Sequence, residues 1–361
     1  MTTRRHSANQ RRRGKYGFNG RQRQKIYGAL DLGTNNCRLL IARPNGQGFQ
    51  VLASFSRVVR LGEGLASSGR LSDSAMNRAI DALNVCAAKL RENKVSVTRN
   101  IATEACRRAD NGDDFLARIK REANLEFETI SCQEEARLAI TGCQCLLDVR
   151  SPYALVFDIG GGSTELIWSK LGRGDSYEIA DVLSLPFGVV NLSEHCSTDV
   201  IDQNCYEKMV RDIAKKLPTF CDNNRINERV QEGLVQMLGT SGTVTTLGAM
   251  HLNLPYYSRS LIDGLELNFE DISATSRQLT ELDYEGRAAL PCIGRERAEL
   301  VIPGCAILDA ICRTWPVGKL RVADRGLREG MLLELMMADG LPVSGNPPAI
   351  EIMSKRPSEQ R

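Results

Sequence analysis

The sequence predicts an α/β protein of two related lobes with a cleft between them. An acid followed by a glycine turn, set between two apolar runs, occurs twice, at 31–34 and at 158–161, 127 residues apart. Short apolar runs also alternate with stretches of helical period along most of the chain, as they do in α/β proteins. Because such a repeat indicates an internal duplication, we expect each copy to begin one lobe.

The elements of the first lobe follow in order after an N-terminal arm. Apolar runs at 25–32, 37–42 and 50–55 predict three strands joined by tight polar turns. Residues 73–91 place apolar side chains at helical spacing behind Ser72, a candidate N-cap. We then expect a strand at 96–103, a helix at 113–123, a strand at 127–131 and a helix from about 133.

The second lobe repeats this opening. Residues 154–157 and 164–168 predict strands on either side of the second glycine turn. A strand at 234–238 leads into a third polar loop at 239–243, and a helical segment follows. Near the end we expect a strand at 320–322, a turn at 324–330 and a helix at 331–337.

The expected domain organisation has four parts. The boundary between the lobes should fall in the short polar stretch 148–152, which ends in proline. The parts are a disordered basic arm at 1–25, a first lobe at 26–150, a second lobe at 151–340 and a flexible proline-containing tail at 341–361.

Composition limits the class of protein. Hydrophobic residues make up 42% of the 361 and charged residues 25%, which is typical of a globular chain. No window approaches the roughly 18 consecutive apolar residues of a membrane span. The basic N-terminus lacks the apolar core of a secretory signal. We therefore expect a cytoplasmic protein that does not enter membranes.

Charge is unevenly distributed. The arm carries nine Lys or Arg residues, and the rest of the chain holds 38 basic against 44 acidic residues. The arm is either a solvated tail or a tether for a polyanion. Because the body is acidic, we expect no specific nucleic-acid partner.

Several familiar sites are absent from the sequence. With three histidines and no C-x-x-C among the 12 cysteines, no zinc spacing can be assembled. There is no G-x-x-x-x-G-K-[ST] phosphate loop. The glycines at 62 and 64 begin a G-x-G-x-x-G pattern, but Ser67 stands at its third position, so dinucleotide binding is disfavoured.

The two acid–glycine turns predict a phosphate site with a metal ion. Glycine lets the backbone approach a ligand and aim N–H groups at phosphate oxygens, and Thr34 and Ser163 can add hydroxyl donors. An aspartate beside such a nest repels phosphate unless a cation lies between them, so Asp31 and Asp158 imply a divalent metal, Mg²⁺. The alternative, a pair of ordinary hairpin turns, is disfavoured by the repeat and by the third loop.

A glutamate beside this site is a candidate base. Ser131 and Glu134 match a capping box, which leaves Glu135, about 100° further around the helix, free to face elsewhere. A glutamate in a first turn can also simply favour the helix dipole. Hydrolysis of a phosphoanhydride, however, needs an oriented water and a proton acceptor. Arg107 and Arg38, which follow a strand and the first turn, are candidate phosphate contacts or ordinary surface cations.

Taken together, these motifs resemble one family. From about residue 27 to 340 the chain resembles the exopolyphosphatase and guanosine pentaphosphate phosphatase family, within the superfold of sugar kinases, heat-shock ATPases and actin. The segments 133–138 and 158–166 are the most specific, whereas single D-x-G turns occur across the superfold. The resemblance rests on the segments 29–35, 102–105, 133–138, 158–166, 239–243 and 326–330.

The resemblance implies two actin-like, ribonuclease H-like lobes and a set of site residues. Glu135 falls on the family's catalytic glutamate, which activates the attacking water, and Asp158 and Glu165 fall on its acids that hold the metal or position water. Arg38 and Arg297 match arginines that contact phosphorylated guanosine ligands. The implied phosphate-binding residues are Asp31, Gly33, Thr34, Asn35, Arg107, Gly160, Gly161, Gly162, Ser163, Gly239, Ser241, Gly242 and Thr243.

The chain also departs from the family's pattern. Asn36 stands where a serine is common, and we expect no C-terminal helical domain of the HD type after the second lobe. The chain therefore resembles the short, two-lobe form, for which action along very long polyphosphate is less expected. By analogy with the family we expect a homodimer.

Three functions remain open at this stage. The first is an exopolyphosphatase, because polyphosphate needs only a basic groove and no pocket for a base. The second is a guanosine pentaphosphate (pppGpp) 5′-phosphatase, and the third is a sensor that binds guanosine tetraphosphate without hydrolysing it. A sugar kinase or ATPase of the same superfold is disfavoured by the helix that begins near Glu135.

Overall fold

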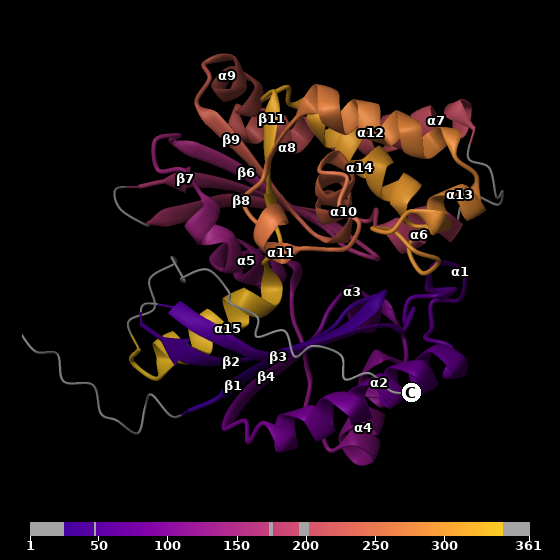
Figure 1. Ribbon diagram of the computed structural model, residues 1–361, viewed down its shortest axis with the longest axis vertical. Helices are drawn as coiled ribbons and strands as arrows, with labels where there is room; N and C mark the ends of the chain where they lie inside the picture. Colours follow the sequence, from indigo (N-terminus) through magenta and orange to yellow (C-terminus); the bar gives the residue numbers. More distant parts are fainter. Residues whose placement is uncertain (1–24, 47, 173–175, 195–201, 342–361) are drawn as a thin grey trace, which may run out of the picture.

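A computed structural model of the chain describes residues 25–46, 48–172, 176–194 and 202–341. It has two lobes, one stacked on the other, and each is built on its own β-sheet (Figure 1). The expected arm, apart from Lys25, and the expected tail, apart from Leu341, lie outside the described residues. Within the described residues, no helix has the length and apolar character needed to cross a membrane.

The first lobe contains a five-stranded sheet in the order β3-β2-β1-β4-β5. The meander β1-β2-β3 is antiparallel, and β4 runs parallel to β1. One face of the sheet is covered by α2 (Asp73–Glu92) and α4 (Gly112–Ala123), which share a buried apolar cluster with it. The strands are β1 (Tyr27–Leu32), β2 (Asn36–Asn45), β3 (Gly48–Val58), β4 (Val97–Ala102) and β5 (Glu128–Thr129), and the short helices are α1 (Leu65–Ser68) and α3 (Glu104–Arg108).

The second lobe contains a six-stranded sheet in the order β10-β11-β9-β6-β7-β8. Its strands are β6 (Tyr153–Ile159), β7 (Thr164–Leu171), β8 (Tyr177–Leu185), β9 (Val235–Thr240), β10 (Glu266–Asn268) and β11 (Lys319–Ala323). Its helices are α6 (Val189–Glu194), α7 (Gln203–Ala214), α8 (Pro218–Asn224), α9 (Ile226–Gln231), α10 (Gly242–His251), α11 (Arg259–Ile262), α12 (Phe269–Glu281), α13 (Tyr284–Ala289) and α14 (Val301–Thr314).

The two sheets share one topology. In each, an antiparallel meander of three strands (β1-β2-β3 and β6-β7-β8) is followed by a parallel strand (β4 and β9) beside its first strand. The fifth position is taken by β5 in one sheet and by β11 in the other. The predicted fold of two related α/β lobes is therefore confirmed.

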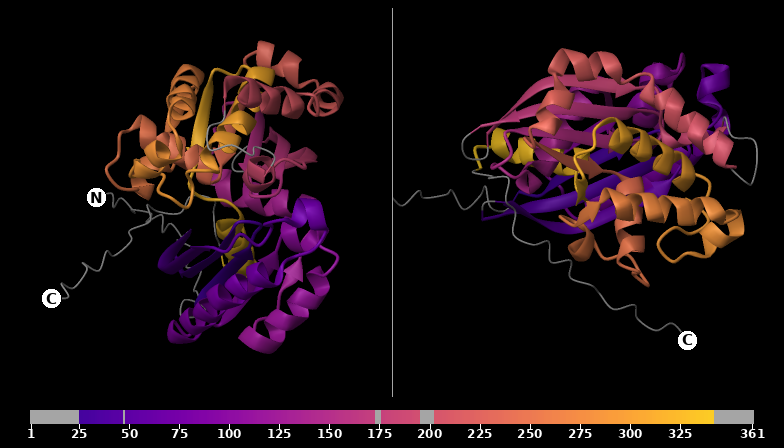
Figure 2. Two further views of the ribbon diagram at one scale, coloured as in Figure 1. Left: turned by 90° about the vertical axis from the view of Figure 1, so that its right-hand side faces the viewer. Right: turned by 90° about the horizontal axis from the view of Figure 1, so that it is seen from above.

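Two helices cross between the lobes. Helix α5 (Cys132–Cys143) comes before β6 in the chain, yet Ala136, Ala139 and Ile140 pack on the second sheet. Helix α15 (Leu327–Ala338) follows the last strand of the second sheet, yet its apolar side chains pack on β1 and β2 of the first. In Figures 1 and 2, α15, in yellow, accordingly lies against the indigo strands of the first lobe.

The crossing helices touch through glycine. A Cβ atom on Gly142 of α5 would lie 1.9 Å from the carbonyl oxygen of Gly326, and one on Gly330 of α15 would lie 2.0 Å from the carbonyl oxygen of Leu138. Any side chain at these two positions would push the helices apart. The pair therefore forms a tightly packed connection between the lobes.

The helix starts confirm the predicted caps and correct two details. Ser72 and Ser131 accept hydrogen bonds from the amides of Ala75 and Glu134. The carboxylate of Glu134, however, binds arginines rather than returning to the amide of Ser131, so only half of the predicted capping box forms. The predicted turn at 324–330 was too long, because α15 already begins at Leu327.

Two further strand predictions differ from the structure. The strand expected at 127–131 is reduced to the two residues of β5, both exposed, at the edge of the sheet. Strand β8 was not predicted, although it completes the meander of the second lobe.

Candidate active site

The duplicated hairpins place equivalent charged residues side by side. Asp31 near the end of β1 pairs across the hairpin with Arg38, and Asp158 near the end of β6 pairs with Glu165. Directly opposite residues on antiparallel strands share one face of the sheet. The first lobe therefore presents one acidic and one positively charged side chain, whereas the second lobe presents two acidic side chains.

Each hairpin turn is closed in the same way. The amide of Gly33 donates to the carbonyl of Asn36, and the amide of Gly160 donates to the carbonyl of Ser163, both over 2.9 Å. This shared bond shows that the duplication extends to the geometry of the turns.

The backbone carbonyls of both loops already accept hydrogen bonds from groups of their own lobe. The carbonyl of Thr34 accepts from the amide of Gly62, and that of Asn35 accepts from the amides of Val59 and Arg60. In the second lobe, the carbonyls of Gly160 and Gly161 accept from the amides of Val189 and Val190, and that of Gly162 accepts from the side chain of Asn191.

The loop amides, in contrast, are left free. The amides of Thr34, Asn35, Gly161 and Gly162 donate no hydrogen bond to any described residue. An array of unused N–H groups on glycine-rich turns is an anion-binding arrangement. Both predicted phosphate loops therefore have the polarity that a phosphate ligand requires.

The two loops meet across the lobes. A Cβ atom on Gly161 would lie 3.0 Å from the amide nitrogen of Asn35, and one on Gly162 would lie 1.9 Å from a carboxylate oxygen of Glu104. Glu104 in turn accepts a hydrogen bond of 3.0 Å from the hydroxyl of Thr34. The glycines of the second lobe are thus required for its close approach to the first.

Four carboxylates gather beside these loops. Burial, followed by the charge on Glu165, raises the pKa of Glu135 well above its ordinary value. Asp158 and Asp31 raise this pKa further, while Arg107 opposes the rise. The predicted acids Asp31, Asp158 and Glu165 are therefore all electrostatically coupled to Glu135.

Glu135 is held by the predicted arginine. Nη1 of Arg107 lies 3.2 Å from Oε2 of Glu135 and donates to the carbonyl of Ile130 over 2.8 Å. Both side chains are partly shielded from solvent. Arg107 therefore links α3, which follows strand β4 of the first lobe, to the first turn of α5.

Glu165 is a deeply buried acid of the second lobe. Its Oε1 accepts hydrogen bonds from the hydroxyls of Ser163, over 2.7 Å, and Ser184, over 2.9 Å. Burial raises the pKa of Glu165 to about 7, and it raises the pKa of Asp158 to about 6. Such raised values mark carboxylates that repel one another and that a nearby cation would stabilise.

The predicted Mg²⁺ is compatible with this arrangement. Among the described residues no group of three or more His, Cys, Asp or Glu side chains could hold a metal by itself. Mg²⁺, however, commonly takes only one or two carboxylates and completes its shell with water and substrate phosphates. The paired acids Asp158 and Glu165 match that donor set. Asn35 Oδ1, which is buried and has no hydrogen-bond partner among the described residues, is a further oxygen near the loops.

The third loop lies at the same edge of the second sheet. Thr240, at the end of β9, pairs in register with Asp158, and α10 begins two residues later at Gly242. Ser241 has a φ of 110°, which is strained for a residue other than glycine, and its hydroxyl is buried without a partner in the described chain. Thr243 is also buried, with its side chain where a Cβ on Gly304 would clash.

Gly239 has a packing role that the sequence did not predict. It lies inside β9 rather than in the loop, and a Cβ atom there would lie 2.6 Å from the ring of Phe157. Its predicted contact with phosphate stays a prediction.

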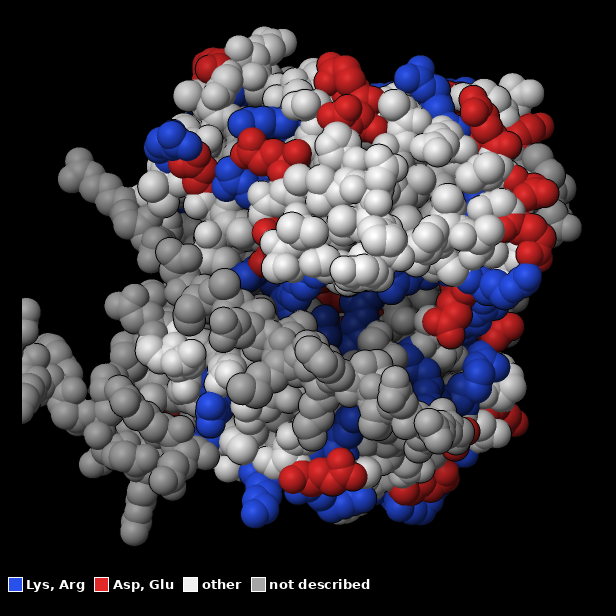
Figure 3. All heavy atoms as spheres, viewed as in Figure 1, with Lys and Arg blue, Asp and Glu red and all other residues white. Residues whose placement is uncertain are grey.

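The two predicted guanosine contacts have different surroundings. Arg38 faces Asp31 and is electrostatically coupled to both Asp31 and Asp158. Arg297 is exposed on the segment between α13 and α14, and no described contact joins its side chain to the carboxylate cluster. Blue Lys and Arg atoms nevertheless line the hollow between the lobes in Figure 3.

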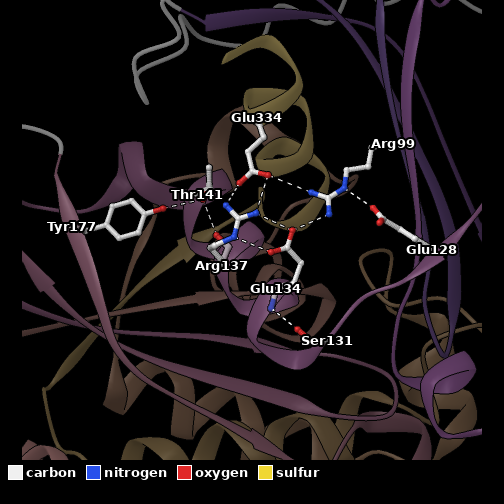
Figure 4. Close-up of polar contacts among 8 residues, drawn as sticks. All are labelled: Arg99, Glu128, Ser131, Glu134, Arg137, Thr141, Tyr177 and Glu334. Atoms are coloured by element: carbon white, nitrogen blue, oxygen red, sulfur yellow. Dashed lines mark hydrogen bonds and ion pairs between the residues drawn. The ribbon is translucent and has the colours of Figure 1, made fainter. Parts of the chain in front are cut away.

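A network of ion pairs holds the helix that carries Glu135 (Figure 4). Arg99 of β4 binds Glu128 and Glu134 over 2.8 Å each and Glu334 of α15 over 3.3 Å. Arg137 of α5 binds Glu134 over 2.8 Å and also Glu334. The network therefore ties α5 to the first sheet and to α15.

Three residues at the site were not singled out from the sequence. Glu104 lies inside a motif that the sequence displays, so a signal existed for it. Ser184 lies on the unpredicted strand β8, and Asn191 lies on α6, which no pattern marked. For these two no local signal existed.

Comparisons with known proteins agree with this geometry. The model of the Ppx/GppA phosphatase family matches residues 40–338. A Photobacterium profundum protein named guanosine-5′-triphosphate,3′-diphosphate pyrophosphatase is 30% identical over 312 residues, which are 86% of this chain and 59% of that longer protein.

Solved structures resemble the whole described fold. The structure of an exopolyphosphatase from Cytophaga hutchinsonii has a TM-score of 0.78 at 25% identity and covers 89% of this chain and all of its own. An Aquifex aeolicus member of the Ppx/GppA family has a TM-score of 0.69 at 28% identity, over 87% of this chain and 98% of its own.

Proposed function

Because the chain belongs to the Ppx/GppA phosphatase family, we propose that it is an exopolyphosphatase that releases the terminal phosphate of inorganic polyphosphate by attack of water. The chemical class, a phosphoanhydride hydrolase, is common to the relatives named above. The observation that carries the proposal is the cluster of four carboxylates beside two loops with free amides.

In the proposed mechanism the free amides of the two loops bind the oxygens of the terminal phosphate. Glu135 orients the attacking water and accepts its proton, while Arg107 holds the carboxylate in place. The water oxygen bonds to phosphorus, the bond from phosphorus to the bridging oxygen breaks, and the leaving phosphate takes that electron pair.

A divalent cation completes the proposed site. Mg²⁺ held by Asp158 and Glu165 would supply positive charge that offsets the phosphate oxygens. The hydrogen bonds from Ser163 and Ser184 keep Glu165 oriented toward that position. Glycines at 161 and 162 allow the two loops to meet closely.

The second candidate substrate is pppGpp. The name of the Photobacterium relative favours it, and the same residues would act on its terminal 5′ phosphoanhydride. Polyphosphate remains the first candidate because it needs only a basic groove and no pocket for a nucleobase. Lys and Arg atoms line the hollow between the lobes in Figure 3.

The test measures phosphate release with Mg²⁺ from short polyphosphate, long polyphosphate and pppGpp in parallel. Faster turnover of polyphosphate supports the proposal, whereas a preference for pppGpp supports the second candidate function. If none is hydrolysed while guanosine tetraphosphate still binds, the enzyme assignment is wrong and a sensor remains. Removal of Mg²⁺ with a chelator should abolish the release of phosphate.

A further inference from the structure

The motif at 326–330 is prominent in the sequence, but the mechanism above uses none of its residues. It forms the start of α15, where Gly326 is the N-cap. Glu329 is already committed inside the protein, because its carboxylate accepts from Arg259 over 2.7 Å and from the amide of Gly326 over 3.0 Å. Asp324 also pairs with Arg259, over 3.4 Å.

Arg328, in contrast, has no such partner. It makes no hydrogen bond and no ion pair with any residue that the structure describes, although a guanidinium has five donors. It is only partly exposed, so solvent does not fully replace the missing partner. Burial lowers the pKa of Arg328, as does the charge on Arg38, whereas Glu329 and Asp31 raise it.

Its position relates it to the cleft. Helix α15 packs on β1 and β2, the two strands that carry Asp31 and Arg38. The charges of Arg38 and Arg328 both act on Asp31, so the two guanidinium groups approach the same carboxylate from different elements. The start of α15 also lies beside the second lobe's loops, because the hydroxyl of Thr240, which is in register with Asp158, donates to the carbonyl of Arg325 over 2.7 Å.

We propose that Arg328, whose guanidinium has no hydrogen-bond partner among the described residues, binds together with Arg38 the phosphate next to the one under attack. A guanidinium fork matches phosphate oxygens and pairs with them strongly when shielded from water. The inference rests on the proposed function in taking the substrate to be a phosphoanhydride chain.

This placement gives Arg328 a defined part in the reaction. As water bonds to the terminal phosphorus and gives its proton to Glu135, the bridging bond breaks and negative charge grows on the leaving phosphate. Arg328 and Arg38 stabilise that growing charge, so the arginine acts on the transition state as well as on binding. Polyphosphate and pppGpp both present such a neighbouring phosphate.

The experiment compares Arg328→Gln and Arg328→Lys with Arg118→Gln. Arg118 is an arginine of α4 that binds Glu122 and Asn77 on the surface of the first lobe, and serves as the matched control. For each protein we would measure kcat/KM, the melting temperature, and the affinity for methylenediphosphonate with Mg²⁺ by calorimetry. This probe presents two linked phosphonates that water cannot separate.

We expect Arg328→Gln to lower kcat/KM by about 100-fold, the typical effect of removing one such donor. It should weaken the binding of the probe at least tenfold. Arg328→Lys should be intermediate, because it keeps the charge and loses the fork. Wild-type affinity for the probe in Arg328→Gln would overturn the inference.

The two proposals can fail separately. If the wild-type protein hydrolyses no substrate but binds the probe, and Arg328→Gln removes that binding, the proposed function fails and the inference holds. If the wild type hydrolyses polyphosphate and Arg328→Gln does so equally well, the inference fails and the function holds. A wild-type protein that does not bind the probe overturns the inference.

Discussion

At the scale of single residues, the surroundings of each glutamate decide what it can do. Glu135 lies among other carboxylates, and burial together with Glu165 raises its pKa. Glu329 is buried as deeply, yet Arg259 and Arg328 overcome the effect of burial and hold its pKa at about 2. One environment suits a proton acceptor and the other suits a structural anion.

The first prediction concerns the candidate base. Glu135→Gln should lower kcat for phosphate release by about 10²–10⁴-fold, because glutamine cannot accept the proton of the attacking water. The melting temperature should not fall, since the change removes one of four mutually repelling acids. Phosphate release and thermal unfolding would be measured beside Glu122→Gln, an exposed control. Unchanged kcat would exclude the assigned role.

The second prediction concerns pH and Glu329. Its pKa in the folded protein lies below the ordinary value of 4.5, so its ion pairs stabilise the fold above pH 4.5. That contribution, about 3 kcal/mol from the size of the shift, is lost as the pH falls from 4.5 toward 2.

Urea unfolding of the wild type and of Glu329→Gln at several pH values would check this. The difference in unfolding free energy should be largest at pH 7 and should shrink below pH 4.5. A difference that is equal at pH 7 and pH 3 would contradict the assignment.

At the scale of elements, helices α5 and α15 connect the two lobes. Each helix leaves the sheet it is nearest to in sequence and packs on the other one. Glu135 and Arg328 both lie in the first turns of these helices. The glycine contacts and the network in Figure 4 therefore help to fix the positions of two proposed site residues.

The third prediction tests that network. Arg99→Gln breaks contacts with Glu128, Glu134 and Glu334, on three different elements. Because these pairs are partly exposed, stability should fall by only about 1 kcal/mol. We expect kcat to fall by about tenfold with little change in KM, since small displacements of Glu135 slow the reaction.

Arg118→Gln is again the control, and the measurements are steady-state kinetics and thermal unfolding. If Arg99→Gln lowers the melting temperature while kcat stays at the wild-type value, the network stabilises the fold without positioning Glu135.

At the scale of the whole molecule, the lobes also meet far from the crossing helices. Arg60 of the first lobe pairs with Glu299 of the second over 2.6 Å. The amide of Gly64, just before α1, donates to Glu194 of α6 over 2.8 Å. Such exposed contacts add little stability, but they act directly on the separation of the lobes.

The fourth prediction uses this pair. Arg60→Glu places two negative charges together and should favour an open arrangement, with a larger radius of gyration by small-angle scattering and a higher KM. The double variant Arg60→Glu/Glu299→Arg should restore both values. If the single variant matches the wild type in both measurements, the pair has no part in closure.

Local patterns determined much of this protein. The duplicated turns, the Ser72 and Ser131 caps and the strand alternation follow from interactions between residues close in sequence, so the sequence alone predicted them. The acids of the candidate site could be selected for the same reason, because turns and helix starts specify which side chains are held at an element's end, and their roles stay a prediction.

Only the tertiary structure decided how these pieces combine. An apolar face shows that a helix will be buried but not against which sheet, so the crossing of α5 and α15 could not be read from the sequence. Ser184 and Arg328 became site residues through β8 and α15, whose neighbours lie far away in the chain. Long-range packing determines which sheet a helix contacts, because the local sequence makes either sheet an equally suitable partner.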